Sequence, residues 1–209
     1  MIFATLLIFA AATPDELGNK LQTALGAAAD FSADFKHTHF AAARRGKGRT
    51  ESGKVFIKKP GLMRWDYDKP TVKYFVVDGE RLWFYKPEEA QVIVNDKFKT
   101  AEISAGLSFL WSTKKLSDDF EMRHFAGPDP QGQPVPPDAI KLTPKKEDPE
   151  VKDIVFYLDK SGFIQKAMSK DHLGNINVLE FENVKLNQGL KKDAFLFVPP
   201  DGVKVIHVD

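Results

Sequence analysis

Apolar and polar residues alternate along most of this chain, and a period of two is typical of β-strands with one buried face. Phe31 and Phe35 alternate with polar neighbours, and so do Met63, Trp65 and Tyr67. The segments that share this alternation are 31–36, 55–57, 63–67, 71–77, 81–85, 91–94, 120–126, 139–143, 151–159, 163–170 and 175–185. They predict a mainly β protein with about eleven antiparallel strands in sequential hairpins. Such a sheet closes into a barrel, folds into a sandwich, or stays open and concave beneath a cover.

Two segments have a helical period, one before the strands and one between them. Thr13, Pro14 and Glu16 match a helix start with a capping box, and apolar residues follow at 17, 21, 25 and 28. A second helix is predicted over 98–111, where it has to cross or cover the sheet, and Gly106 lowers its stability. The apolar stripe of this second helix consists of Ile103, Leu107, Leu110 and Trp111.

Residues 1–12 form an uncharged apolar run that ends in three alanines. The run is too short to span a bilayer, for which a helix needs about 20 residues, and its end is typical of a signal peptidase site. We therefore expect a cleaved signal peptide over 1–12 and a single domain over 13–209. Because the sequence has no Cys, we expect a protein that is soluble after export and carries no lipid on a cysteine.

The sequence offers little catalytic or cofactor chemistry. It has no nucleophile elbow, phosphate-binding loop or dinucleotide fingerprint, so we expect neither an enzyme nor a cofactor. His37 and His39 share one face of a strand and could hold a metal, but two solvated histidines are the simpler interpretation, and we predict no metal site. The formal net charge of +1 argues against a nucleic-acid partner.

A basic segment covers residues 44–49, with the sequence RRGKGR. Such a segment could contact anionic headgroups or an acidic partner. A solvated hairpin tip is the favoured interpretation, because the segment lies between two alternating runs.

Apolar side chains of two neighbouring runs share strand parity, although the turn between the runs could reverse one relative to the other. These side chains are Val55, Ile57, Met63, Trp65 and Tyr67. Together with the stripe of the helix predicted over 98–111, they form either a plain core between helix and sheet or the lining of a cavity for an apolar ligand.

The segment around these residues resembles a known family. The sequence GKVFIKKPGLMRWDY at 53–67, then Pro70 and DGERLWFY at 78–85, resembles the outer-membrane lipoprotein carrier protein family, the LolA type. The segment LTP at 142–144 fits as well, and FLFVPPDGV at 195–203 is similar to the C-terminal signature of the family. The likeness covers nearly the whole chain after residue 12.

The resemblance implies an open, eleven-stranded half-barrel whose concave face is covered by helices and holds lipoprotein acyl chains. It implies a monomeric periplasmic carrier that receives lipoproteins from an inner-membrane ABC transporter and delivers them to an outer-membrane acceptor. We expect the nine apolar residues of strands 55–57 and 63–67 and of the helix over 98–111 to line the acyl cavity. A carrier or sensor of another lipid, such as a phospholipid or glycolipid, is the alternative. A lipid hydrolase is a second rival, for which no motif supplies a nucleophile.

One position departs from the family pattern. An Arg usually precedes the Pro in this family and ties the sheet to the lid, whereas Lys59 stands here. Lysine offers a point charge instead of a planar fork of donors. We expect the ammonium group of Lys59 to bond carbonyl oxygens at the end of the covering helix over 98–111, where helix dipoles favour a cation.

Overall fold

The computed structural model describes residues 12–44, 47–98 and 115–208. The helices and strands in these ranges are α1 (Pro14–Ala27), β1 (Asp30–Phe40), β2 (Gly48–Lys58), β3 (Leu62–Lys69), β4 (Lys73–Val77), β5 (Leu82–Lys86), β6 (Gln91–Asn95), α3 (Leu116–Asp119), β7 (Phe120–His124), β8 (Ala139–Pro144), β9 (Asp153–Leu158), β10 (Ile164–Lys170), β11 (Ile176–Leu186) and β12 (Lys204–Val208). Short 3-10 helices cover Ala42–Arg44, Pro87–Glu89 and Lys192–Phe195.

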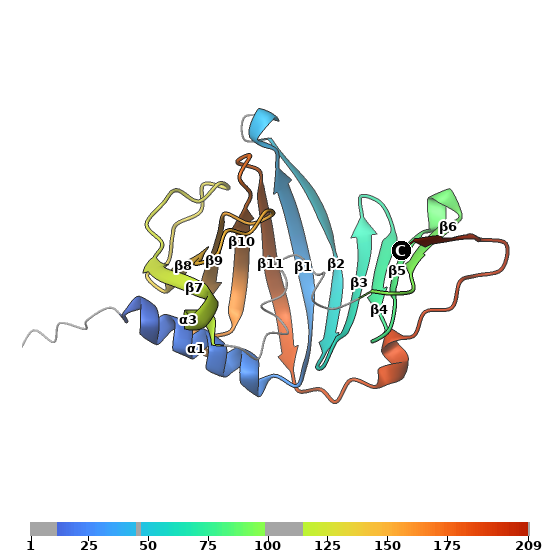
Figure 1. The fold of residues 1–209 in the computed structure, drawn as a ribbon, viewed down its shortest axis with the longest axis horizontal. Helices are drawn as coiled ribbons and strands as arrows, with labels where there is room; N and C mark the ends of the chain where they lie inside the picture. Colours follow the sequence, from blue (N-terminus) through green and yellow to red (C-terminus); the bar gives the residue numbers. More distant parts are fainter. Residues whose placement is uncertain (1–11, 45–46, 99–114, 209) are drawn as a thin grey trace, which may run out of the picture.

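The twelve strands of the described residues form one sheet in the order β12-β6-β5-β4-β3-β2-β1-β11-β10-β9-β8-β7. Figure 1 shows the two wings of this sheet, β2 to β6 on one side and β10 to β7 on the other, meeting at the β1–β11 pair. The prediction of a mainly β, open antiparallel sheet is confirmed.

The pairing of the twelfth strand does not follow from the pattern of the sequence. β12 lies against β6 in parallel, with Val205 opposite Val92. Parallel neighbours cannot be joined by a tight turn; β12 reaches its place through residues 187–203, which run from the end of β11 to the edge at β6 (Figure 1). Because this pairing depends on a long connection, the alternation of residues did not reveal it.

The helix predicted from Thr13 is confirmed, including its capping box. The backbone N–H of Thr13 donates to the Glu16 carboxylate at 2.7 Å, and the N–H of Glu16 donates to the Thr13 hydroxyl at 3.2 Å. Leu17, Leu21 and Leu25 of α1 are buried, and α1 contacts α3, β7 and β8. No helix within residues 12–44, 47–98 and 115–208 is long and apolar enough to cross a membrane.

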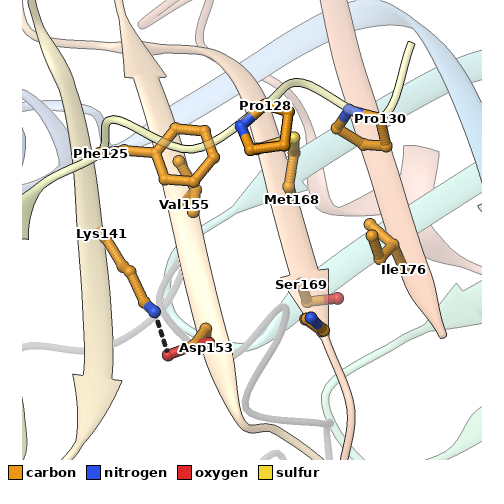
Figure 2. Close-up of a pocket in the computed structure, with 10 residues that line it drawn as sticks. Phe125, Pro128, Pro130, Lys141, Asp153, Val155, Met168, Ser169 and Ile176 are labelled. Carbon is orange, nitrogen blue, oxygen red and sulfur yellow. Dashed lines mark ion pairs between the residues drawn. The ribbon is translucent and has the colours of Figure 1, made fainter. Parts of the chain in front are cut away.

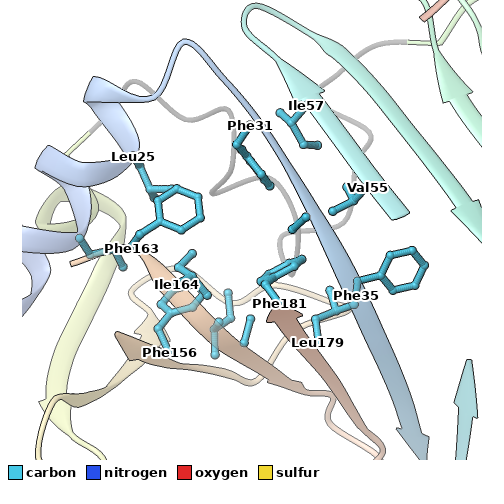
Figure 3. Packing of buried hydrophobic residues seen from close by; sticks show 14 of the residues in the cluster. Leu25, Phe31, Phe35, Val55, Ile57, Phe156, Phe163, Ile164, Leu179 and Phe181 are labelled. Atoms are coloured by element: carbon cyan, nitrogen blue, oxygen red, sulfur yellow. The ribbon is translucent and has the colours of Figure 1, made fainter. Parts of the chain in front are cut away.

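One face of the sheet, here called the inner face, packs against α1 and holds the largest apolar cluster. Figure 3 shows labelled members of this cluster from α1, β1, β2, β9, β10 and β11 pointing toward a common interior. Its large buried side chains include Leu17, Leu21, Leu25, Phe31, Phe35, Val55, Ile57, Met63, Trp65, Tyr67, Phe156, Phe163, Ile164, Leu179 and Phe181.

The opposite face, here called the outer face, carries two smaller apolar clusters. In one wing, Val155, Tyr157 and Met168 pack with partly buried Phe125 and Val135 of the segment between β7 and β8. In the other wing, the cluster consists of Val76, Trp83, Val92 and Val94, against which Phe197 and Val203 of the C-terminal segment pack. Since strand residues alternate between faces, the sheet is apolar on both sides beneath these covers.

Candidate functional site

The five sequence-predicted residues of β2 and β3 lie on the inner face together. The register places Val55 opposite Trp65 and Ile57 opposite Met63, and residues paired across strands share a face. The turn between β2 and β3 therefore does not reverse one run relative to the other. All five belong to one buried cluster, so the structure brings together this part of the predicted site.

Aromatic rings extend this surface beyond the residues that the sequence singled out. The ring of Phe35 on β1 lies edge-on to Trp65 and to Tyr67, with centroid distances of 4.8 Å in both pairs. Phe181 on β11 lies 6.5 Å from Trp65. The strand parity of 31–36 was visible in the sequence, but the adjacency of β1, β3 and β11 side chains depends on strand order. The sequence alone therefore did not predict that Phe35 and Phe181 belong to the site.

Trp65 has a buried donor for which the described residues supply no acceptor. Its indole N–H makes no hydrogen bond within the described residues, and the side chain is only 4% exposed. Tyr67 lies on the same face, and burial raises the pKa of its hydroxyl. The ammonium group of Lys73 lies 4.3 Å from the Tyr67 ring centroid and is paired with Glu51 at 2.8 Å.

The predicted covering helix falls outside the described residues. This applies to its four site residues, Ile103, Leu107, Leu110 and Trp111, and they stay a prediction. Phe98, the first residue of the predicted segment, is described, and its partly buried side chain packs against the inner-face cluster.

Lys59 contacts the C-terminal end of α1. Its Nζ donates to the main-chain carbonyl oxygen of Leu25 at 2.6 Å, and its backbone N–H donates to Ala29 O at 2.9 Å. Burial lowers the pKa of the Lys59 ammonium group. The resemblance led us to expect this cation at the end of a helix over 98–111. The structure places it at the end of α1, where the free carbonyl groups and the helix dipole favour a positive charge.

The same end of α1 is held from a second side. The Asn187 side chain accepts a hydrogen bond from Ala29 N at 2.8 Å and donates one to Ala27 O at 3.1 Å. Asp30, which is 3% exposed, accepts the backbone N–H of Gln188 at 2.7 Å. The junction of α1 with β1 is therefore bonded to both the β2–β3 turn and the segment after β11.

A separate pocket of about 240 Å³ lies on the outer face beneath the proline-rich segment 125–138 (Figure 2). Its lining residues are Phe125, Pro128, Pro130, Lys141, Asp153, Val155, Met168, Ser169, Lys170 and Ile176. Within it, Lys141 and Asp153 form an ion pair at 2.9 Å.

Asp129 fastens the segment 125–138 to the sheet. Its carboxylate accepts from the Lys166 ammonium group at 2.6 Å and from the Tyr157 hydroxyl at 2.8 Å, and Asp129 and Lys166 are both buried. Burial by itself raises the pKa of Asp129, but the hydrogen bonds from Lys166, Gln131 and Tyr157 outweigh it and hold the pKa below its usual value. This network has a structural role on the face opposite the inner-face cluster.

His37 and His39 do lie on one face, where both face the same amide. His37 Nε2 lies 3.2 Å and His39 Nδ1 lies 3.1 Å from Asn177 Oδ1. Burial lowers the pKa of His37, and the hydrogen bond to Asn177 opposes this shift. Within residues 12–44, 47–98 and 115–208, no group of three metal-binding side chains occurs.

The basic segment 44–49 follows β1 in the chain and includes Gly48 and Arg49 at the start of β2, which pairs with β1 along its whole length. The choice between a solvated tip and a contact with headgroups or an acidic partner stays a prediction. Arg49 at the start of β2 is exposed, and its Nη2 lies 3.7 Å from Glu51.

The family model and the similar curated proteins agree on one family. The family described as outer membrane lipoprotein carrier protein LolA matches residues 27–198. A protein from Nitrosospira multiformis, named outer-membrane lipoprotein carrier protein, is 30% identical over 205 residues, which cover 98% of this chain and 95% of that protein. A protein of the same name from Nitrosomonas europaea is 30% identical over 190 residues, covering 89% and 86%. Among solved structures, a LolA superfamily protein from Nitrosomonas europaea has a TM-score of 0.44 at 12% identity, covering 90% of this chain and 99% of that chain.

Proposed function

Because this chain belongs to the LolA family of outer-membrane lipoprotein carriers, we propose that it shields the acyl chains of lipoproteins against the inner face of its sheet. The protein is thus a lipoprotein carrier, and the proposal concerns where the cargo lies. The observation that carries it is the continuous apolar surface of α1 and the inner-face strands, in which Val55, Ile57, Met63, Trp65 and Tyr67 lie together.

Keeping acyl chains out of water requires a large apolar surface. Each methylene group removed from water contributes roughly 0.8 kcal/mol, so two or three acyl chains account for tens of kcal/mol. Burial against the inner face recovers much of this free energy without any chemical step or cofactor. Delivery requires that the cargo bind the carrier less tightly than it binds the acceptor.

We further propose that α1 moves to admit cargo. Its apolar side chains Leu17, Leu21 and Leu25 occupy the inner-face cluster, and acyl chains have to replace some of these contacts. Lys59, bonded to Leu25 O, then acts as a latch that favours the cargo-free arrangement. The segment 98–111, with Ile103, Leu107, Leu110 and Trp111, is proposed as a second cover.

We also propose the route along which the carrier works. We propose that residues 1–12 direct export to the periplasm and are removed, and that the carrier works there as a monomer. An inner-membrane ABC transporter supplies the lipoprotein and an outer-membrane acceptor receives it. Family membership supports this route, because a lipoprotein that reaches the outer membrane has to cross the aqueous space between the membranes.

Identification of the native cargo tests the proposal. The full chain is purified from the periplasm without detergent, and bound lipid is identified by mass spectrometry. Triacylated or diacylated cysteine peptides are expected. Phospholipid or glycolipid in stoichiometric amount would instead support the alternative carrier role and contradict the proposal.

A further inference from the structure

Trp65 carries a buried hydrogen-bond donor that the described part of the chain leaves without an acceptor. Buried polar groups in native proteins are nearly always paired, and an unpaired one is destabilising. Trp83 shows the usual arrangement, because its Nε1 donates to Asp78 Oδ2 at 2.8 Å. The unpaired N–H of Trp65 therefore stands out in a chain whose other described Trp is satisfied.

The neighbours of Trp65 explain why its donor is unpaired. Phe35 and Phe181, both labelled in Figure 3, present rings to it at 4.8 Å and 6.5 Å between centroids. Its cross-strand partners are Val55 on β2 and Phe75 on β4. None of these four side chains has an oxygen or nitrogen acceptor, so within the described residues the donor is free to bond a molecule that enters this cluster.

We propose that the Trp65 indole N–H donates a hydrogen bond to a carbonyl oxygen of the bound cargo, at the ester or amide that joins an acyl chain to its headgroup. The proposal rests on the proposed carrier function and adds a polar recognition element to it. The rings around Trp65 contact methylene groups of any lipid equally well. The N–H distinguishes an acyl group from a plain alkyl chain.

This donor gives the apolar surface chemical selectivity. A site built to hydrogen-bond a polar group discriminates against an analogue that lacks it, because the buried donor then stays unpaired. An ester-linked lipid satisfies the N–H, whereas an alkyl ether of the same length has no carbonyl oxygen. The inferred role of Trp65 is therefore to position the carbonyl end of the cargo.

The test compares two probes on the full chain: a peptide with an N-terminal dipalmitoyl-glyceryl cysteine, and the same peptide with two hexadecyl ethers. Affinities are measured for the native protein, Trp65→Phe and Trp83→Phe. Phenylalanine keeps an aromatic ring and removes the donor. Trp83→Phe is the matched control, because its side chain lies on the outer face. Circular dichroism verifies that each variant is folded.

We expect Trp65→Phe to weaken binding of the ester probe by about 2- to 12-fold, the range of one net hydrogen bond, and to leave binding of the ether probe within about twofold. Trp83→Phe is expected to change neither affinity. Equal losses for both probes would overturn the proposal, since they would reflect ring packing alone. No loss for either probe would overturn it as well. Failure of the native protein to bind either probe would instead reject the carrier function.

A spectroscopic measurement examines the bond directly. In nitrogen-15 spectra, the indole signal of Trp65 is assigned by its absence in Trp65→Phe. Loading with the ester probe is expected to move its proton downfield, and loading with the ether probe is not. A signal already at a hydrogen-bonded position in the empty protein would contradict the proposal, because the donor would then have a partner within the chain.

Discussion

Lys59 and Leu25 join the sheet to helix α1, through a 2.6 Å hydrogen bond from the Lys59 ammonium group to the Leu25 carbonyl oxygen. A charged hydrogen bond of this kind contributes about 1.5–3 kcal/mol. That amount biases the position of α1 and is small beside the burial of acyl chains. The hydrogen bond therefore has to break when α1 moves away from the sheet and the site opens.

Replacing Lys59 with Leu is expected to leave cargo uptake within about twofold and to slow release by roughly tenfold, the effect of losing about 1.4 kcal/mol of bias toward the empty arrangement. The measurement is transfer of a labelled lipoprotein from the carrier to acceptor membranes. Lys59→Arg, which keeps a cationic donor, serves as the control and is expected to release normally. Equal release rates for Lys59→Leu and the native protein would reject the latch.

Trp65→Glu is expected to abolish lipoprotein pickup. A carboxylate there faces Phe35 and Phe181 without a partner, and a buried unpaired charge costs several kcal/mol, so it keeps water in the space that acyl chains need. Lys54→Glu introduces the same group on an exposed position of β2 and is the matched control. Binding is measured with purified lipoprotein after gel filtration establishes that both variants are folded. Normal pickup by Trp65→Glu would show that cargo lies elsewhere.

Asp129→Asn is expected to lower the free energy of unfolding by about 3–5 kcal/mol, because Lys166 then remains as a buried cation without a counter-charge. Urea denaturation gives the value. The double variant Asp129→Asn/Lys166→Met is expected to recover part of the loss. Lipoprotein binding by the folded single variant should stay unchanged, since this network lies on the outer face. A decrease in the free energy of unfolding smaller than about 1 kcal/mol would contradict the structural role.

Stability is also expected to fall as the pH drops below about 6.5, the unperturbed pKa of histidine. The pKa of His37 is lowered in the folded protein by burial. As the pH falls, the histidine is therefore protonated in the unfolded chain before it is protonated in the folded protein, and this stabilises the unfolded state. The loss is about 1.4 kcal/mol for each pH unit between the unfolded and folded pKa values. Urea titrations at pH 7.5 and pH 5 of the native protein and of His37→Gln check this. The variant should show a smaller difference, and an identical difference would remove His37 as the cause.

Processing of the N-terminus is expected within a few residues of Ala12, just before the capped start of α1 at Thr13. N-terminal sequencing of protein recovered from the periplasm provides the measurement. Recovery of chains that begin at Met1 from that compartment would contradict the signal-peptide prediction.

Local features of the fold were predictable from the sequence and distant ones were not. The capping box of α1 depends on Thr13 and Glu16, three positions apart, and it was visible. The shared face of Met63, Trp65 and Tyr67 followed from strand parity, but the placement of Val55 on that face was left open by the turn and is given by the register of β2 and β3. The Asp129–Lys166 pair joins residues 37 positions apart, and neither partner is marked by any local pattern. For Lys59 the sequence indicated a helix end, but only the packing of α1 decided which helix.

The seam between β1 and β11 has a consequence for how the chain reaches its native state. Asp30 and Gln188, bonded at one end of that seam, are 158 positions apart, while most other neighbouring strands form local hairpins. Each wing can assemble by itself, but the central pairing has to wait for a long loop to close, which slows folding. Until then, β1 and β11 each present an open edge beside Phe35 and Phe181. The newly exported chain is therefore most prone to aggregate before the seam closes, and a periplasmic chaperone that covers free strand edges would raise its yield.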